Sequence, residues 1–297
     1  MVNTKMYWIH AITPLHVGSG RGVGFIDLPI MREKVTGWPL VPGSSVKGVM
    51  REHFVRKDKD NDLINAAFGK PDDDKGNKSN AGALVLSDAR IVCLPVRSLY
   101  GTFAFASCPL VLERLKRDLD SAEHKSGPVE MSFEDDEVVV TTGSKVERNG
   151  NVFLEDLDFS IITDDGETNE WAELLAGLLF PNDAAWQGIF KERFIILSNN
   201  CFSFLSETGT EVNARIKIDQ EKKIVIGGAL WYEESLPSET ILAGLAWCDR
   251  DYSGKGIAQE NIFSEFCPNE AMNLQIGGKA TVGKGRVRCL FTKSEGE

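Results

Sequence analysis

The chain has 297 residues, of which 42% are hydrophobic and 26% charged, and its formal net charge is −11. This composition predicts a globular protein, large enough for one elaborated domain or two small ones. No apolar run approaches the roughly 20 residues of a membrane span, and the N-terminus lacks the layout of a signal peptide, so we expect a cytoplasmic protein with no membrane partner.

The charge is distributed unevenly along the chain. Residues 1–57 hold 8 Lys and Arg against 3 Asp and Glu, a balance of +5, and residues 271–297 hold 5 against 2, a balance of +3. The total of −11 leaves −19 for residues 58–270. An acidic total argues against indiscriminate nucleic-acid binding, but the two basic ends are compatible with a local basic track.

The chain begins with a strand, a glycine-rich loop and a helix. Residues 6–17 are rich in β-prone side chains and predict a strand, and the glycine density of residues 18–24 predicts a loop after it. Ser44 or Ser45 suits a helix N-cap, and apolar residues then recur at helical spacing. We therefore expect a helix over about 45–56.

Two polar stretches, about 57–82 and 120–150, interrupt the pattern and read as insertions. Between them, residues 83–94 predict a strand, and a leucine stripe predicts a helix over 109–119. The remaining predicted elements are a helix at 171–180, strands at 194–205, 214–219 and 222–231 with a tight Gln220-Glu221 turn between the last two, a helix at 241–249, and a final strand at 286–292.

The six cysteines are scattered, with no Cys-x-x-Cys pair and no nearby histidine. Such a distribution is typical of reduced, buried, inert thiols and does not favour a zinc site. Acyl hydrolysis has no support either, because the chain lacks a Gly-x-Ser-x-Gly elbow, and no His-Glu-x-x-His motif occurs.

Two glycine-rich basic stretches, 42–48 and 277–286, suit a phosphate chain, because glycine permits close approach and the cations neutralise charge. The second nearly spells a P-loop, but Gly285 stands where Ser or Thr should hold magnesium, and the following residues predict a strand. ATP binding is therefore the least favoured interpretation. A backbone track for RNA and a glycine-rich hairpin with solvated lysines remain open.

A single carboxylate, Asp27, sits in an apolar segment with no charged partner nearby in sequence. An unpaired Asp in such a segment suggests a chemical role, but an Asp that caps a turn before Pro29 explains the same pattern. His10 and His16 lie near this region, and a lone histidine is more often structural than chemical. In the pair Glu233-Glu234, we expect one carboxylate to face solvent and the other to cap or coordinate a group.

The sequence also resembles the RAMP proteins of CRISPR systems, through motifs that cover nearly the whole chain. They are 13–20 (TPLHVGSG), 24–30 (GFIDLPI), 41–48 (VPGSSVKG), 81–84 (AGAL), 87–90 (SDAR), 95–98 (PVRS), 210–216 (TEVNARI), 232–237 (YEESLP) and the loop 277–285. The set is most similar to the repeated backbone subunit of type III-B (Cmr) effector complexes, and the type III-A (Csm) backbone subunit shares the early motifs.

The resemblance implies an α+β fold with a ferredoxin-like, RRM-type core and a projecting β-hairpin thumb. The chain would be a single domain over 1–297, with insertions at about 57–82 and 120–150 and the thumb at about 199–226. It also implies an RNA-guided endoribonuclease that binds guide RNA along a filament of its own copies and other Cmr subunits, and cuts complementary target RNA at regular intervals. The alternative is a non-catalytic guide-RNA-binding scaffold, including the type III-A subunit.

The family's site residues can be carried over onto matching positions. The catalytic aspartate falls on Asp27, which would also hold Mg²⁺ or Mn²⁺, its helper histidine falls on His16, and its acidic residue falls on Glu233 or Glu234. The residues expected to bind RNA are Gly20, Arg21, Gly43, Ser44, Ser45, Lys47, Arg51, Arg215, Gly278, Lys279, Thr281, Lys284 and Arg286.

Overall fold

The computed structural model describes residues 4–20, 22, 24–57, 59–72, 79–129, 131–218, 221 and 225–292. The strands are β1 (Thr4–Ala11), β2 (Leu40–Val41), β3 (Leu84–Leu86), β4 (Ala89–Arg97), β5 (Phe103–Ser107), β6 (Glu137–Val140), β7 (Glu147–Arg148), β8 (Asn151–Leu154), β9 (Leu157–Ile161), β10 (Phe194–Leu197), β11 (Glu211–Ile218), β12 (Val225–Ser235), β13 (Ile241–Cys248), β14 (Met272–Gln275) and β15 (Arg286–Phe291).

The helices are α1 (Gly43–Arg56), α2 (Asn61–Phe68), α3 (Pro109–Ser121), α4 (Glu167–Leu179), α5 (Ala184–Lys191), α6 (Asn199–Thr208), α7 (Gln259–Phe266) and the short 3₁₀ helix η1 (Ala280–Val282). Within the described residues, none of them has the length and apolar content needed to cross a membrane. Helices and strands are mixed around one large sheet, which confirms the predicted α+β class.

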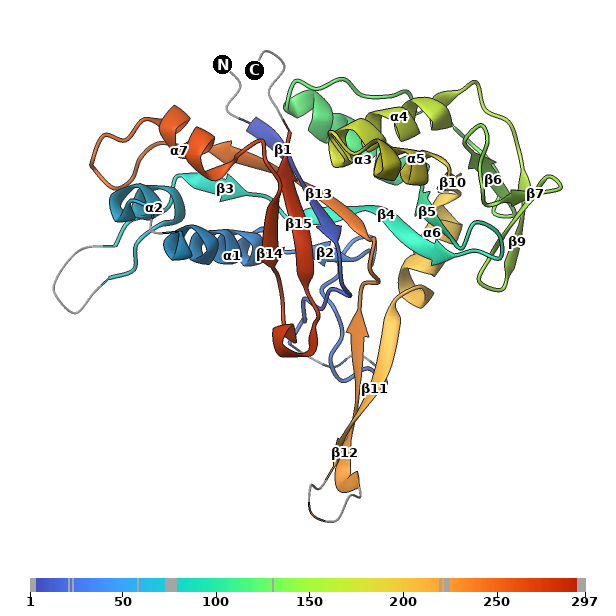
Figure 1. Ribbon diagram of the computed structural model, residues 1–297, viewed down its shortest axis with the longest axis horizontal. Helices are drawn as coiled ribbons and strands as arrows, with labels where there is room; N and C mark the ends of the chain where they lie inside the picture. The colour runs from blue at the N-terminus through green and yellow to red at the C-terminus, as the bar shows by residue number, and fades with distance from the viewer. Residues whose placement is uncertain are drawn as a thin grey trace.

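One long sheet runs through the body of the molecule in the order β14-β15-β1-β13-β4-β5-β10-β6-β9-β8-β7 (Figure 1). In its first half, β15, β1, β13 and β4 are neighbours and each pair is antiparallel. Helix α1 follows β1, and α7 lies between β13 and β15 in sequence. The chain therefore has the β-α-β-β-α-β connectivity of a split βαβ unit in this half.

The second half of the sheet is built by the segment between β4 and α6. It adds β5, β10 and β6–β9, with α3, α4 and α5 over one face. The stretch 120–150, predicted as an insertion, holds the end of α3 together with β6 and β7, so it is part of this larger unit. The stretch 57–82 contains α2, whose N-cap Asp60 accepts hydrogen bonds from the amides of Asp62 and Leu63.

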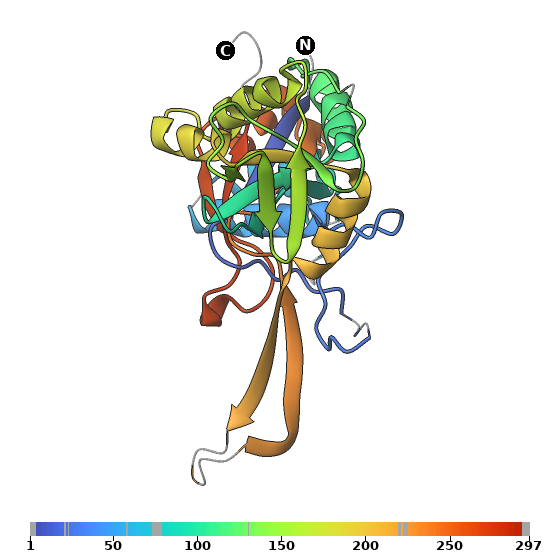
Figure 2. The same cartoon turned by 90° about the vertical axis from the view of Figure 1, so that its right-hand side faces the viewer.

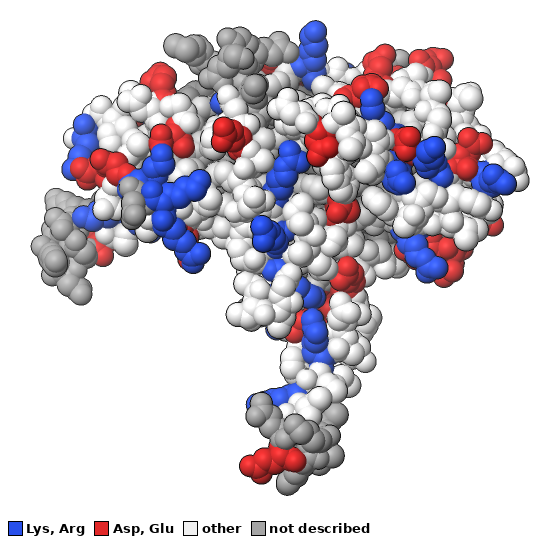
Figure 3. Space-filling view, in the orientation of Figure 1, with Lys and Arg blue, Asp and Glu red and all other residues white. Residues whose placement is uncertain are grey.

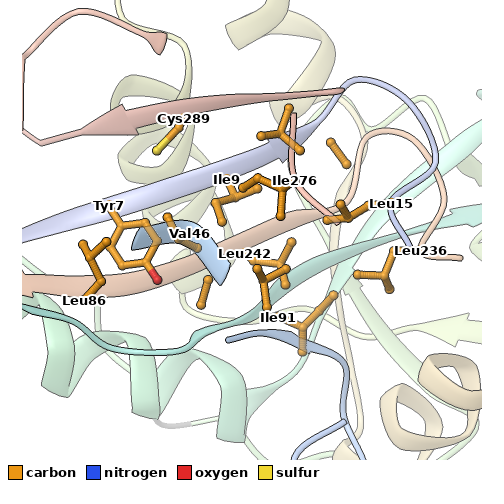
Figure 4. Packing of buried hydrophobic residues seen from close by; sticks show 14 of the residues in the cluster. Tyr7, Ile9, Leu15, Val46, Leu86, Ile91, Leu236, Leu242, Ile276 and Cys289 are labelled. Carbon is orange, nitrogen blue, oxygen red and sulfur yellow. The ribbon is translucent and has the colours of Figure 1, made fainter. Parts of the chain in front are cut away.

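The central strand β1 separates two hydrophobic cores. Tyr7 and Ile9 point into one core, where they meet Val46 of α1 (Figure 4). Met6 and Trp8 point into the other, which contains residues of α3 and α4. Because successive side chains of a strand point to opposite faces, burial on both sides favours the uninterrupted apolar run over residues 6–9 in the middle of the strand.

The same reasoning corrects the helix predicted at 241–249, which is strand β13. Leu242 packs in the core that contains Tyr7, and Ala243 packs in the opposite one. A short run that is apolar at every position cannot be told from a buried helix by its periodicity. Gly244 fits the strand for a steric reason, because a Cβ there would lie 2.6 Å from the Tyr7 ring.

The strand predicted at 194–205 is also wrong in its second part. Strand β10 ends at Leu197, and Ser198 caps α6 by accepting a hydrogen bond from the amide of Cys201 at 3.1 Å. An N-cap serine of this kind starts a helix even where the following residues are apolar.

A two-stranded ribbon of β11 and β12 projects from the body (Figures 1 and 2). The thumb predicted at about 199–226 thus begins with helix α6, and its second strand continues to Ser235. The ladder runs from the pair Glu211–Ser235 outward, with an irregularity between Ile216 and Ile218. Glu221 is described, whereas Gln220 of the predicted turn lies outside the described residues.

All six cysteines are unpaired, and five of them are buried, while Cys201 is half-buried. Burial raises the pKa of Cys108 and of Cys289 to about 12. Thiols of this kind stay protonated at neutral pH. The predicted burial is confirmed for five of the six cysteines, and their inert role stays a prediction.

Candidate functional site

The two motif-rich ends of the chain meet at the root of the β11–β12 hairpin. The amides of Ile12 and Thr13 donate to the carbonyl of Arg286 at 2.9 and 3.1 Å, and the amide of Gly278 donates to the carbonyl of His16 at 2.9 Å. Figure 2 shows the C-terminal loop with η1 (red) on one side of the hairpin root and the loop between β1 and β2 (blue) on the other. Residues 12–16 and the C-terminal loop are therefore joined by backbone hydrogen bonds.

Two glycines of the C-terminal loop are required by its path. Gly277 has φ of 78°, and a Cβ there would lie 2.2 Å from the carbonyl oxygen of His16. Gly285 has φ of 82°, and a Cβ would lie 2.1 Å from the carbonyl oxygen of Ile276. Both positions combine a positive φ with a close backbone approach, which only glycine permits without strain. The packing of the loop is therefore enough to explain these two glycines, without any bound ligand.

The structure places Asp27 at the edge of β12 with its side chain exposed. Its Oδ2 accepts a hydrogen bond from the amide of Tyr232 at 2.8 Å. The next residue, Leu28, pairs with Glu233 in a parallel bridge. Among the described residues, Asp27 makes no ion pair. Its carboxylate is thus bound to the hairpin root across a long separation in sequence, and it is exposed.

His16 is buried and contacts the same strand. Its Nδ1 lies 2.6 Å from the carbonyl oxygen of Glu234. Because a carbonyl oxygen only accepts, Nδ1 carries the proton and donates it. Its Nε2 borders Gly18, where a Cβ would lie 3.0 Å away. His16 and Asp27 thus contact β12 two residues apart, which is about 7 Å along a strand.

Glu233 is buried, with 2% of its surface exposed, and is surrounded by donors. Its Oε1 accepts from Trp231 Nε1 and Lys279 Nζ, both at 2.7 Å, and its Oε2 lies 3.4 Å from Arg215 Nε. Burial alone would raise the pKa of Glu233, but the hydrogen bonds from Lys279 and Trp231 and the positive charges of Lys279 and Arg215 lower it from 4.5 to about 2. The carboxylate therefore links both hairpin strands to the C-terminal loop.

This depressed pKa predicts a pH dependence of stability. Because the pKa is lower in the folded state, Glu233 stabilises the fold above pH 4.5, and this contribution is lost as the pH falls toward 2. We expect wild type to exceed Glu233→Gln by up to about 3 kcal/mol in unfolding free energy at pH 6, and the difference to shrink between pH 4.5 and 3. Urea unfolding at several pH values measures it, with Glu113→Gln, exposed on α3, as the control. A difference that does not vary with pH would contradict the assignment.

Glu234 faces the opposite side of β12 from Glu233, as adjacent residues of a strand must. It is 2% exposed. Its Oε2 accepts from the amide of Ile30 at 2.9 Å, and its Oε1 accepts from Arg32 Nη2 at 2.6 Å and from Thr210 Oγ1 at 3.0 Å. The structure thus separates the two glutamates: Glu233 binds the cationic loop, and Glu234 binds the segment that carries Asp27. The expectation that one of them faces solvent is wrong, because adjacent residues of β12 point to opposite sides and both sides are covered at the hairpin root.

Besides Lys279, which pairs with Glu233, the other two lysines expected to bind RNA are also engaged by the protein itself. Lys284 is buried, and its Nζ donates to Ser235 Oγ at 2.6 Å. Lys47 donates to the carbonyl of Leu84 at 2.6 Å. Burial lowers the pKa of both lysines. Neither ammonium group projects freely into solvent as the sequence suggested.

The other residues expected to bind RNA differ in exposure. Gly20, Ser44, Gly278, Thr281 and Arg286 are exposed, Ser45, Arg51, Arg215 and Lys279 are half-buried, Gly43 is buried, and Arg21 lies outside the described residues. Gly278–Lys284 is followed by β15 rather than a helix, as the sequence predicted, so the loop has no helix N-terminus to offer a nucleotide.

Sequence reasoning missed a groove between α1 and the C-terminal loop. Its basic residues are Arg56, Lys57 and Arg286, and its other lining residues are Val49, Glu52, His53, Asn273, Leu274, Gln275, Gly277 and Ala280. Figure 3 shows Lys and Arg gathered near the end of α1 and in a column that continues onto the hairpin. The sequence did show basic residues at the end of the predicted helix 45–56. It could not show that β14 and the C-terminal loop lie opposite them and complete the groove.

Comparisons with known proteins identify the family of the chain. A family model described as the RAMP superfamily matches residues 8–288. The CRISPR system Cmr endoribonuclease Cmr4 of Pyrococcus furiosus is 35% identical over 285 residues, which cover 95% of this chain and 94% of that protein. A crystal structure of oligomeric Cmr4 from the same organism has a TM-score of 0.76 at 28% identity and 98% coverage of both chains.

A chain in the type III-B Cmr-beta complex bound to cognate target RNA shares the fold, with a TM-score of 0.73 at 23% identity, and 97% of this chain and 96% of that one are covered. The family match spans most of the chain, including the segments that carry Asp27, His16 and Glu233. This chain therefore belongs to the RAMP superfamily.

Proposed function

We propose that this chain is the RNA-guided endoribonuclease subunit that forms the backbone of a type III-B CRISPR effector complex. The observation that carries the proposal is the exposed Asp27 carboxylate, hydrogen-bonded to the hairpin root beside the Glu233–Lys279–Arg215 cluster. A Cmr endoribonuclease with 35% identity over nearly the whole chain supports it. The substrate is then RNA complementary to a bound guide.

The chemistry of such a cut asks little of the protein, because RNA carries its own nucleophile. The 2′-oxygen bonds to phosphorus, the bond from phosphorus to the 5′-oxygen breaks, and the leaving oxygen takes a proton from solvent. In our proposal Asp27 accepts the proton of the 2′-hydroxyl. Lys279 and Arg215 stabilise the negative charge that develops on the scissile phosphate. The hairpin root holds the RNA strand so that the 2′-oxygen is in line for attack.

A divalent cation fits the donor set at Asp27. The carboxylate is exposed, and magnesium keeps most of its waters and needs only one or two carboxylates together with phosphates. In the part of the chain that the structure describes, no three potential ligands cluster, so Asp27 would hold Mg²⁺ or Mn²⁺ together with the RNA itself. When bound, the ion supplies positive charge to the scissile phosphate.

The remaining partners follow from the shape of the molecule. The exposed glycines and Arg286 of the C-terminal loop, with the groove beside α1, offer backbone amides and cations to the phosphates of a guide RNA. The Pyrococcus relative is described as oligomeric. We extend this to a cytoplasmic filament of copies of this chain, bound to guide RNA and to other Cmr subunits.

The test is target cleavage by the reconstituted complex, with end-labelled RNA complementary to the guide. We expect fragments at regular intervals, one for each copy of this chain, and none from non-complementary RNA. Chelation with EDTA should stop the cleavage while target binding persists in a gel-shift assay. A single cut at one end would instead favour a scaffold whose cleavage is done by another subunit, and undiminished cleavage in EDTA would remove the metal from the proposal.

A further inference from the structure

The segment that carries Asp27 is held to the hairpin root by side chains as well as by backbone. The amide of Leu28 donates to the carbonyl of Tyr232 at 3.1 Å, and the amide of Glu234 donates to the carbonyl of Leu28 at 3.0 Å. These bonds fix the segment along β12. They do not fix the hairpin against helix α6, from which its first strand continues.

Arg32 makes that second connection. Its Nη1 donates to the carbonyls of Gly37 at 2.9 Å and of Ser206 at 3.1 Å, and its Nη2 donates to Glu234 Oε1 at 2.6 Å. Ser206 lies in the last turns of α6, and Glu234 lies in β12. One guanidinium therefore ties the Asp27 segment to the elements on both sides of the hairpin root.

Glu234 completes the junction from the other side. It collects donors from Ile30, Arg32 and Thr210, which belong to the Asp27 segment and to the start of the hairpin. Only 3% of its side chain and 24% of that of Arg32 are exposed. The guanidinium of Arg32 donates to three acceptors at once, which requires its planar fork of N–H groups. Lysine lacks this fork and could not make the same set of bonds.

We propose that Arg32 and Glu234 form a positioning pair that sets the register of the hairpin against Asp27, and so determines the rate and the position of cleavage. Neither residue needs to touch RNA, and the pair acts through Asp27 and β12. The inference rests on the proposed function. Misplacing a reacting group by about 1 Å is enough to lower a rate by roughly 100-fold.

The test compares Arg32→Lys with Arg90→Lys in the reconstituted complex. Arg90 forms a similarly half-buried pair with Asp118 of α3, and this pair makes no hydrogen bond to the hairpin root among the described residues. We expect Arg32→Lys to lower kcat about 10- to 100-fold with KM within about 2-fold, and to spread the cut over neighbouring nucleotides. Arg90→Lys should cleave at the wild-type rate and position. Equal rates and equal cut positions in the two variants would overturn the proposal.

A second readout does not depend on cleavage. Hydrogen exchange at the amide of Tyr232, which donates to Asp27, should be at least about tenfold faster in Arg32→Lys than in wild type and unchanged in Arg90→Lys. If Arg32→Lys does not assemble into the complex, Glu234→Gln is tested in its place. Failure of both variants to assemble would overturn the proposal, because the pair would then be needed for folding rather than for positioning Asp27. Wild type that fails to cut would refute the proposed function itself, whereas normal cutting with unchanged exchange in Arg32→Lys would refute only the pair.

Discussion

Replacing Asp27 by Asn should abolish target cleavage by the assembled complex, by at least about 100-fold, and leave guide and target binding within about 2-fold of wild type. Asparagine keeps the shape of the side chain, and its amide oxygen can still accept the hydrogen bond from Tyr232. What it loses is the negative charge and the ability to take a proton. The measurement is the single-turnover cleavage rate at saturating complex, with binding followed separately on the same labelled RNA.

The matched control is Asp158→Asn, which removes another exposed carboxylate, from β9 in the second half of the sheet. It should cleave at the wild-type rate. Undiminished cleavage by Asp27→Asn would refute the assignment of Asp27. Loss of target binding along with cleavage would instead show that the carboxylate supports the shape of the site.

The elements predicted well are those with a local signal. A helical stripe predicted a helix at about 45–56, and α1 spans Gly43–Arg56. The predicted cap at Ser44 or Ser45 is wrong, because both residues lie inside α1, whose N-cap is Pro42 without a side-chain capping bond. The final strand, predicted at 286–292, is β15 from Arg286 to Phe291. Strand β13 and helix α6 were missed because their identity depends on burial on both faces and on a single capping bond.

The candidate site follows the same division. Asp27 could be singled out because a carboxylate in an apolar segment stands out in the sequence alone. Which glutamate faces which side could not be predicted, because the answer depends on the pairing of β12 with Leu28, about 200 positions away in the chain. Arg32 was missed for the same reason, since its acceptors on Ser206 and Glu234 are 174 and 202 positions away.

The glycines of the C-terminal loop allow the convergence of the two ends to be tested directly. Gly277 and Gly283 both have a positive φ, of 78° and 85°, but only Gly277 approaches another backbone, since nothing lies within 4 Å of a Cβ at Gly283. Gly283→Ala should therefore cost only the left-handed conformation, about 1 kcal/mol. Gly277→Ala adds a clash with the carbonyl of His16, so the loop must separate from the segment that carries His16, and we expect a cost of at least about 3 kcal/mol.

Thermal unfolding of the two variants and wild type measures this difference. At a few degrees per kcal/mol for a chain of this size, we expect Gly283→Ala to unfold roughly 2 °C lower and Gly277→Ala at least about 6 °C lower. Gly277→Ala should also weaken guide binding more than Gly283→Ala. Separating the loop from His16 displaces the loop residues that line the basic groove beside α1. Equal losses of stability in the two variants would show that the close approach of the C-terminal loop to His16 does not hold the two ends together. The proposed arrangement of the site at the hairpin root would then be contradicted.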